Sequence, residues 1–198
     1  MNLFATVREN LVVQYFLLAL VVFAVTAMVV ASALARQIES SVVNEVTDDV
    51  IALGRGPLIS FFTPLDFQGS PSDARYQEMD TFVNQFIVTQ KVARVKVWND
   101  QGLVIYSTDR SQVGQHFPIK QELAMALSGG EGRKLDVPED IENDRERFLG
   151  TLLEVYVPAH FQGEAKPRGA FEVYHYYAPV ADQIRSLQGF VYLALGIG

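Results

Sequence analysis

Large amphipathic side chains and charged side chains alternate with aliphatic ones along four stretches of the sequence, residues 92–98, 103–107, 148–160 and 168–177. A period of two is typical of β-strands and places alternate residues on one face of a sheet. Aromatic rings that carry a polar tip, combined with a few charges, are suited to orienting a small molecule in a pocket. The residues of this face are Arg94, Lys96, Trp98, Tyr106, Glu154, Tyr156, Glu172, Tyr174 and Tyr176.

This face has two interpretations, a solvated sheet surface and a ligand pocket. If the strand 168–177 lies between the strands 92–98 and 148–160, then Lys96, Glu172 and Glu154 form an ordinary cross-strand charge ladder. The charges are compatible with either interpretation. The aromatic residues favour a pocket, because four tyrosines and a tryptophan form an unusual exposed patch. The predicted ligand-binding residues on this face are Lys96, Trp98, Tyr106, Tyr156, Glu172, Tyr174 and Tyr176.

The opposite face of the same strands is uniformly apolar, and we expect N-terminal helices to cover it. Its residues are Val95, Val97, Leu103, Ile105, Leu153, Val155, Val157, Phe171 and Val173. Residues 36–54 have helical character, with Gly54 as the expected stop. Val43, Val46, Val50 and Leu53 make an apolar stripe on this helix, which either pairs with a second copy or covers the sheet.

Further elements complete the order of the chain. A second helix is predicted from Ser72 or Asp73 to about residue 87, a short helix over residues 119–130, a strand over residues 132–137, and a last helix from Pro179. Antiparallel strands of one sheet, with helices before and between them, define an α+β domain.

Uncharged segments frame this domain. Residues 11–35 are a 25-residue uncharged run, about 37 Å of helix, enough to cross a bilayer. A cleavable signal peptide is the alternative, with Ala33-Leu34-Ala35 as its cleavage site.

The apolar end of the chain, residues 187–198, is too short to span a bilayer. It is the expected start of a truncated second transmembrane helix, or a tail that folds back. We therefore expect a cytoplasmic N-terminus at 1–10, a transmembrane helix at 11–35 and the domain at 36–186.

Composition excludes several classes of function. The chain has no cysteine, so disulfides and thiolate metal sites are absent, and a net charge of −7 argues against nucleic-acid binding. The three histidines lack metal-ligand spacing, and no nucleophile or phosphate-binding motif occurs. We expect no metal, no cofactor and no enzymatic activity in this segment.

The layout resembles the extracytoplasmic PAS-like sensor domains, of Cache or PDC type, of bacterial transmembrane receptors. The stretches that carry the resemblance are V-x-V-W-N-D-Q-G-L-V-I-Y-S from Val95, followed by Gly114-Gln115, and L-E-V-Y-V-P with G-A-F-E-V-Y-H-Y-Y-A-P. The resemblance implies an antiparallel PAS-like sheet packed by a long N-terminal helix and framed by transmembrane helices.

It also implies a ligand held between the sheet and the segment after the hairpin. There Arg133 and Lys134 favour an anionic ligand, of which a small carboxylate is one candidate. The R-x-W-Y arrangement of the amino-acid-binding subgroup is missing.

The expected function is ligand sensing for a membrane-bound receptor of the histidine kinase, cyclic-dinucleotide enzyme or chemoreceptor type. The expected partners are a small molecule, the lipid bilayer and a second copy of the chain, with the domain outside the inner membrane. A membrane-anchored structural or interaction protein without a ligand is the main alternative, and a tethered hydrolase is a third.

Overall fold

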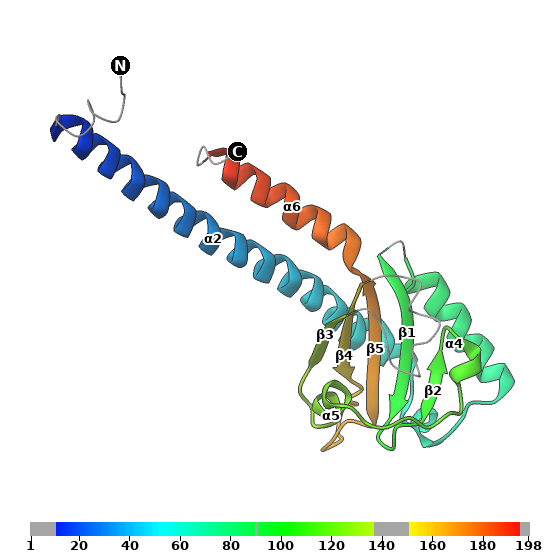
Figure 1. Cartoon of the computed structure of the whole chain (residues 1–198). Coiled ribbons are helices and arrows are strands. Elements are labelled where there is room, and N and C mark those ends of the chain that lie inside the picture. Colours follow the sequence, from blue (N-terminus) through cyan, green and yellow to red (C-terminus); the bar gives the residue numbers. More distant parts are fainter. Residues whose placement is uncertain (1–10, 90, 137–150, 195–198) are drawn as a thin grey trace. The chain divides into compact units, whose positions relative to one another are not determined.

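A computed structural model describes residues 11–89, 91–136 and 151–194 of the chain (Figure 1). The chain divides into two compact units. One contains the chain up to Val43 together with the chain from Asp182 onward, and the other runs from Asn44 to Ala181. The predicted cytoplasmic residues 1–10 and the last four residues of the predicted second span lie outside the described residues.

The first unit contains most of helix α2 (Leu11–Leu53) and most of helix α6 (Tyr177–Ala194). Within it, the Gln188 side chain of α6 donates a hydrogen bond to the Ala35 carbonyl of α2. Among the described residues, one helix is long and apolar enough to cross a membrane, and it is the helix that begins at Leu11. The prediction that this helix continues beyond Arg36 is confirmed, because α2 is unbroken as far as Leu53.

The predicted stop at Gly54 is wrong, because helical backbone continues through a π-helical turn, η1 (Gly54–Leu58), into α3 (Ile59–Phe61). Pro57 lies inside this turn and has no N–H to donate, and the Ile59 N–H bonds the Gly54 carbonyl across the wider π spacing. A Cβ on Gly54 would lie 2.6 Å from a methyl carbon of Val157. Glycine at this position therefore allows close helix–sheet packing rather than ending the helix.

The second unit is built on a five-stranded antiparallel sheet of order β2-β1-β5-β4-β3. Its strands are β1 (Val92–Asn99), β2 (Val104–Ser107), β3 (Gly132–Asp136), β4 (Leu152–Pro158) and β5 (Gly169–Tyr176). The last strand in sequence thus lies between β1 and β4, as the charge-ladder interpretation required. The short helix α5 (Gln121–Leu127) precedes β3, as predicted.

N-terminal helices cover the apolar face of the sheet, as predicted. Phe62 packs edge-on against Phe171 of β5 with ring centroids 5.5 Å apart, and Gly54 abuts Val157 of β4. Val50 of the α2 stripe is buried at 1% exposure. This part of the stripe therefore packs within its own domain.

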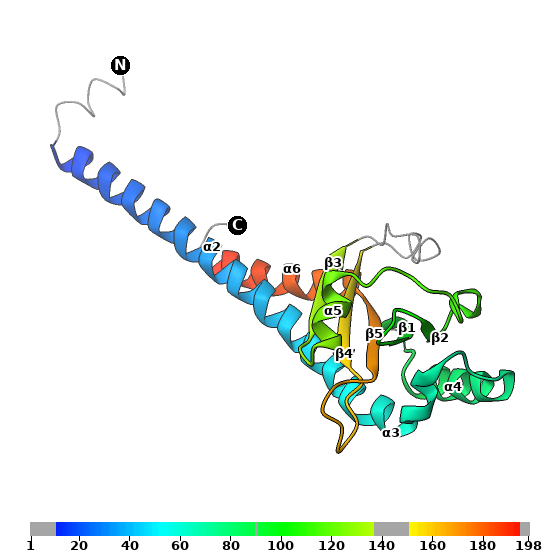
Figure 2. The ribbon, with the colours of Figure 1, turned by 90° about the horizontal axis from the view of Figure 1, so that it is seen from below.

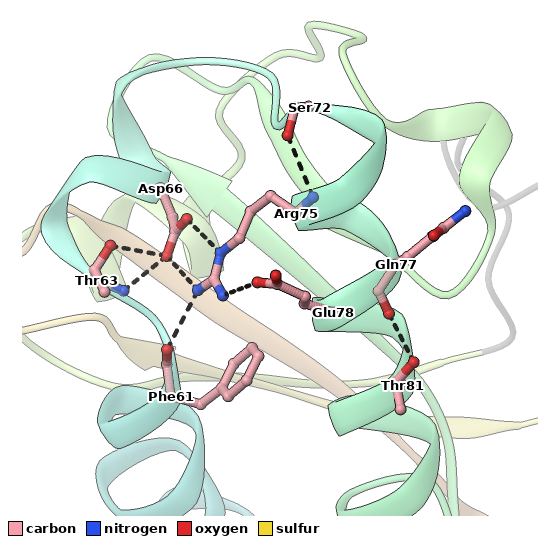
Figure 3. Close-up of polar contacts among 8 residues, drawn as sticks. All are labelled: Phe61, Thr63, Asp66, Ser72, Arg75, Gln77, Glu78 and Thr81. Carbon is pink, nitrogen blue, oxygen red and sulfur yellow. Dashed lines mark hydrogen bonds and ion pairs between the residues drawn. The ribbon is translucent and has the colours of Figure 1, made fainter.

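Helix α4 (Asp73–Phe86) also lies on this face, on the same side of the sheet as α3 (Figure 2). Ser72 caps its first turn by accepting from the Arg75 N–H, as the sequence predicted. The Arg75 guanidinium donates to both carboxylate oxygens of Asp66, at 2.9 and 2.8 Å, and to the Phe61 carbonyl (Figure 3). Burial alone raises the pKa of Asp66, but the bonds from Arg75 and Thr63 bring it below its ordinary value. This ion pair anchors the 3₁₀ turn η2 (Pro64–Gln68) to α4.

Gly169 of β5 has no room for a side chain, and it yields the first prediction. A Cβ there would lie 1.8 Å from the Trp98 carbonyl of β1 and 2.6 Å from the Phe67 ring. Gly169→Ala therefore forces apart a backbone pair, and we expect it to lower the free energy of unfolding by about 3 kcal/mol. The measurement is denaturant unfolding of the full chain in mild detergent. Gly69→Ala is the control, because nothing lies within 4 Å of its Cβ; equal loss in both variants would contradict the prediction.

Candidate ligand-binding site

The polar face of the sheet forms two cross-strand rows centred on β5. Lys96 of β1 lies opposite Glu172 of β5, which lies opposite Tyr156 of β4. In the next row, Tyr174 lies opposite both Arg94 and Glu154. Neighbouring residues in such rows are close enough to contact each other directly. The sheet register therefore brings two carboxylates, a lysine and two phenols together.

Hydrogen bonds connect these side chains. The Trp98 Nε1–H donates to one oxygen of Glu172 at 2.6 Å, and the Tyr156 hydroxyl donates to the other, also at 2.6 Å. Lys96 Nζ donates to the Tyr174 hydroxyl at 3.0 Å and lies 5.1 Å from the centroid of that ring. Glu172 thus accepts at both oxygens, which satisfies a buried carboxylate.

The cluster is buried, so a solvated sheet surface is the wrong interpretation. Lys96 is 0% exposed, and Glu154 and Glu172 are each 1% exposed. Buried ionisable groups carry a large desolvation cost unless they are paired. The ladder of opposite charges exists, but it lies inside the protein. We call Lys96, Trp98, Glu154, Tyr156, Glu172 and Tyr174 the buried polar cluster.

Helix α5 covers one end of the cluster. Leu123 and Ala126 of α5 pack in one apolar group with Trp98, Tyr156, Val104 and Ala170. Phe117, in the segment before α5, meets the Trp98 indole edge-on with ring centroids 5.9 Å apart. The segment that follows the β1–β2 hairpin therefore lies over this face, which is where the resemblance to PAS-like sensor domains implies a ligand.

Tyr106 does not belong to this face, contrary to the prediction. A register shift between Val97 and Trp98 places one extra residue on β2, so Tyr106 lies opposite Val97. A bulge of this kind reverses the alternation of every residue beyond it. Tyr106 is on the helix-covered face, where its hydroxyl donates to Asp80 of α4 at 3.1 Å and its ring lies near Tyr76.

Arg133 is also on the other face. It lies opposite Val155 in the β3–β4 register and donates to the Asn44 side chain of α2 at 2.6 Å. Its neighbour Lys134 lies opposite Glu154, on the polar face. Tyr176 is half-buried at the end of β5, opposite Leu152, and alternation places it on the side of Tyr174. Of the eight predicted residues, five belong to the cluster, and Tyr176 lies beside it.

Three buried polar residues on or beside this face are not among the predicted ligand-binding residues. Glu154 belongs to the predicted polar face but is not among the predicted ligand-binding residues. Ser107 lies opposite Lys96 and its hydroxyl donates to Gln112 at 3.2 Å, and both residues are buried. The sequence signal for Ser107 is its position as the polar last residue of a mostly apolar strand. Gln112 has no such sequence signal, because it lies in the short turn η3 (Arg110–Gln112), outside the periodic strands.

Glu154 is the electrostatically strained member of the cluster. Burial, followed by the charge of Glu172, raises the pKa of Glu154 to about 8. Lys134, Tyr156 and Lys96 oppose this shift without cancelling it. Burial and the nearby Glu172 also raise the pKa of Tyr156 and of Tyr174, so both phenols stay protonated donors. At neutral pH Glu154 is therefore protonated.

Comparison with known proteins identifies the fold. No protein family model and no curated protein matches the chain. The chain is similar to the sensor domain of the V. cholerae histidine kinase DctB, with a TM-score of 0.60 and 14% sequence identity over 81% of this chain and 60% of that one. It is also similar to the E. coli DcuS sensor domain, with a TM-score of 0.48 and 15% identity over 75% of this chain and 98% of that one.

The DctB likeness confirms the predicted fold class. The helix-covered antiparallel sheet with a long N-terminal helix is the PAS-like fold of a sensor domain. The chain spans 60% of the length of that sensor domain. At this level of identity the likeness concerns the fold alone.

The raised pKa of Glu154 predicts that stability falls as the pH rises. A carboxyl whose folded pKa lies above its unfolded value of 4.5 contributes stability that is fully present below pH 4.5 and lost as the pH rises through about 8. Glu154→Gln stays neutral throughout. We expect the wild type to lose on the order of 4 kcal/mol relative to this variant between pH 5 and 9, at about 1.4 kcal/mol per pKa unit.

Denaturant unfolding of both proteins across this pH range measures the difference. Glu164→Gln is the matched control, because Glu164 is on the β4–β5 loop and its bond from Arg168 lowers its pKa. Removing that charge gives no gain in stability at high pH. A wild type that tracks Glu154→Gln in parallel from pH 5 to 9 would show that Glu154 ionises normally.

Proposed function

We propose that this chain is the ligand-sensing input segment of a membrane-bound signalling receptor. The observation that carries the proposal is the junction of two features in one helix: α2 begins in an apolar stretch able to cross a membrane and ends packed in a PAS-like sensor fold. The domain then lies outside the inner membrane, and the segment itself has no catalytic role. A small molecule binds at the buried polar cluster, and the change passes through the membrane helices.

The cluster supports the choice of site because its composition is costly for a purely structural layer. Three ionisable side chains lie on one face at 0–1% exposure, although the opposite face shows that this chain builds an apolar layer readily. Perturbed ionisable groups concentrated in one place are a feature of functional sites.

One observation favours the alternative, a membrane-anchored protein with no ligand. Trp98, Tyr156 and Glu172 already satisfy one another by hydrogen bonds, as a structural polar network does. The two functions differ in whether any small molecule stabilises the domain or changes an output.

A homodimer is part of the sensor proposal, since anchoring in one bilayer holds two copies at high effective concentration. The stripe at Val43–Leu53 is a poor seam, because Val50 is buried within the domain and the neighbouring exposed face carries Glu45 and Asp48. We therefore place the expected contact in the apolar part of α2, residues 11–35.

A chimera tests the sensor function. Residues 1–198 are joined to the cytoplasmic region of a histidine kinase with a measurable reporter, and the cells are exposed to a library of small metabolites. We expect at least one compound to change the output several-fold. Tyr174→Phe removes the hydroxyl that accepts from Lys96 and keeps the ring, and we expect it to shift the half-maximal concentration about tenfold.

Tyr106→Phe is the matched control, because it removes one buried hydroxyl from the opposite face of the same sheet. It should leave the response unchanged at equal protein level. A chimera that inserts and folds but responds to no compound would favour the ligand-free alternative.

A further inference from the structure

Glu154 is the member of the buried polar cluster that the chain leaves short of donors. Its side chain is 1% exposed, and its Oε1 has no hydrogen-bond partner among the described residues. Its Oε2 lies 3.2 Å from the Tyr156 hydroxyl, but that hydroxyl has one proton and lies closer, at 2.6 Å, to Glu172. Buried carboxylate oxygens are nearly always paired, so this one requires a partner from elsewhere.

When Glu154 is ionised, Oε1 carries part of the negative charge and can only accept a hydrogen bond. The neutral acid has one proton, so Oε1 donates when it carries that proton and accepts when Oε2 carries it. Ionised Glu154 therefore requires a donor at Oε1, which a ligand carboxylate does not supply.

The surrounding charges favour a donor that is also a cation. Lys96 lies opposite Glu172 and offsets its charge, so ionised Glu154 leaves the cluster with one negative charge. Lys134, opposite Glu154 on β3, is only half-buried, and its charge is partly screened by solvent. Arg94, in the next row, lies 3.8 Å from Asp109. A carboxylate ligand would add a negative charge beside two glutamates.

Aromatic rings complete the environment for a cation. Trp98, Tyr156 and Tyr174 lie on the same face, and the Tyr174 ring already has the Lys96 ammonium 5.1 Å from its centroid. Ring faces stabilise ammonium groups whose hydration has been removed.

We propose that the cluster binds a small organic amine, whose ammonium group donates a hydrogen bond to Oε1 of Glu154. The proposal rests on the sensor function above and names the chemical class of its ligand. It replaces the small carboxylate expected from Arg133 and Lys134. Of these two, Arg133 is on the other face of the sheet and Lys134 lies opposite Glu154.

Binding of an ammonium ion displaces a proton. Below pH 8 the free protein holds Glu154 as the acid, in keeping with its raised pKa. The bound ammonium stabilises the carboxylate, so the acid releases its proton to the buffer while the amine keeps its own. We therefore expect about one proton released per amine bound at pH 7, and fewer as the pH approaches 9.

The test uses the full chain in lipid nanodiscs. Ethanolamine, putrescine and agmatine form the amine arm, and acetate, succinate and malate form the carboxylate arm, each scored by the shift in melting temperature. A stabilising compound then goes to calorimetry at pH 7 in phosphate and in HEPES, whose different ionisation enthalpies reveal the number of protons released. We expect stabilisation by an amine, release of about one proton, and at least tenfold weaker binding to Glu154→Gln. Glu164→Gln, which removes a charge from the β4–β5 loop, should bind like the wild type.

The outcomes separate this proposal from the sensor function. Stabilisation by carboxylates alone overturns the amine class and supports a sensor of another kind. Amine binding with no proton release, and with equal affinity for Glu154→Gln, overturns the role of Glu154. No stabilisation in either arm counts against the amine site and against the sensor function together. The proton count on the wild type is independent of whether the variant folds.

Discussion

The free-energy cost of burying charge on one face of the sheet constrains the rest of the domain. Lys96, Glu154 and Glu172 are held away from water, and such groups persist only where pairing and hydrogen bonds offset their desolvation. The order β1-β5-β4 supplies that pairing, because it puts the lysine of β1 directly opposite a glutamate of β5. A sheet with β5 at its edge could place it beside only one of β1 and β4.

Burial of apolar side chains on the opposite face of the sheet offsets the free-energy cost of burying these charges. Val95, Val173 and Val155 form a continuous apolar row across β1, β5 and β4, and the helical layer closes over it. Close approach is essential there, as Gly54 against Val157 shows. Because both faces of one sheet are buried, side-chain alternation in the strands separates an apolar layer from a polar one rather than an inside from a surface.

That double burial explains what could and could not be predicted from the sequence. The strands, the short helix before β3, the two-faced character of the sheet and the helical cover follow from periodicity, and periodicity is local. The position of Tyr106 does not follow from periodicity, because a bulge opposite Val97 and Trp98 places its side chain on the other face of the sheet. Bulges depend on how two strands pair, which local periodicity does not show. Arg133 and Lys134 are adjacent in sequence and were treated alike, although strand geometry sends them to opposite faces. Burial of the charged residues could not be predicted from the sequence either, because it depends on which segments of the chain cover the polar face.

Strand β5 connects the two faces, which matters for the proposed relay. Glu172 and Tyr174 belong to the polar cluster, while Phe171, Val173 and His175 alternate with them toward the helical layer. Burial lowers the pKa of His175, and the neighbouring Asp49 of α2 acts in the opposite direction. The strand then leads without a gap into α6 at Tyr177. A change in the charge of Glu154 acts on Tyr174 and Glu172 and therefore on this strand. Strand β5 therefore carries the neighbours of the buried carboxylate on one face and residues of the helical layer on the other, and it is the strand on which the proposed relay depends.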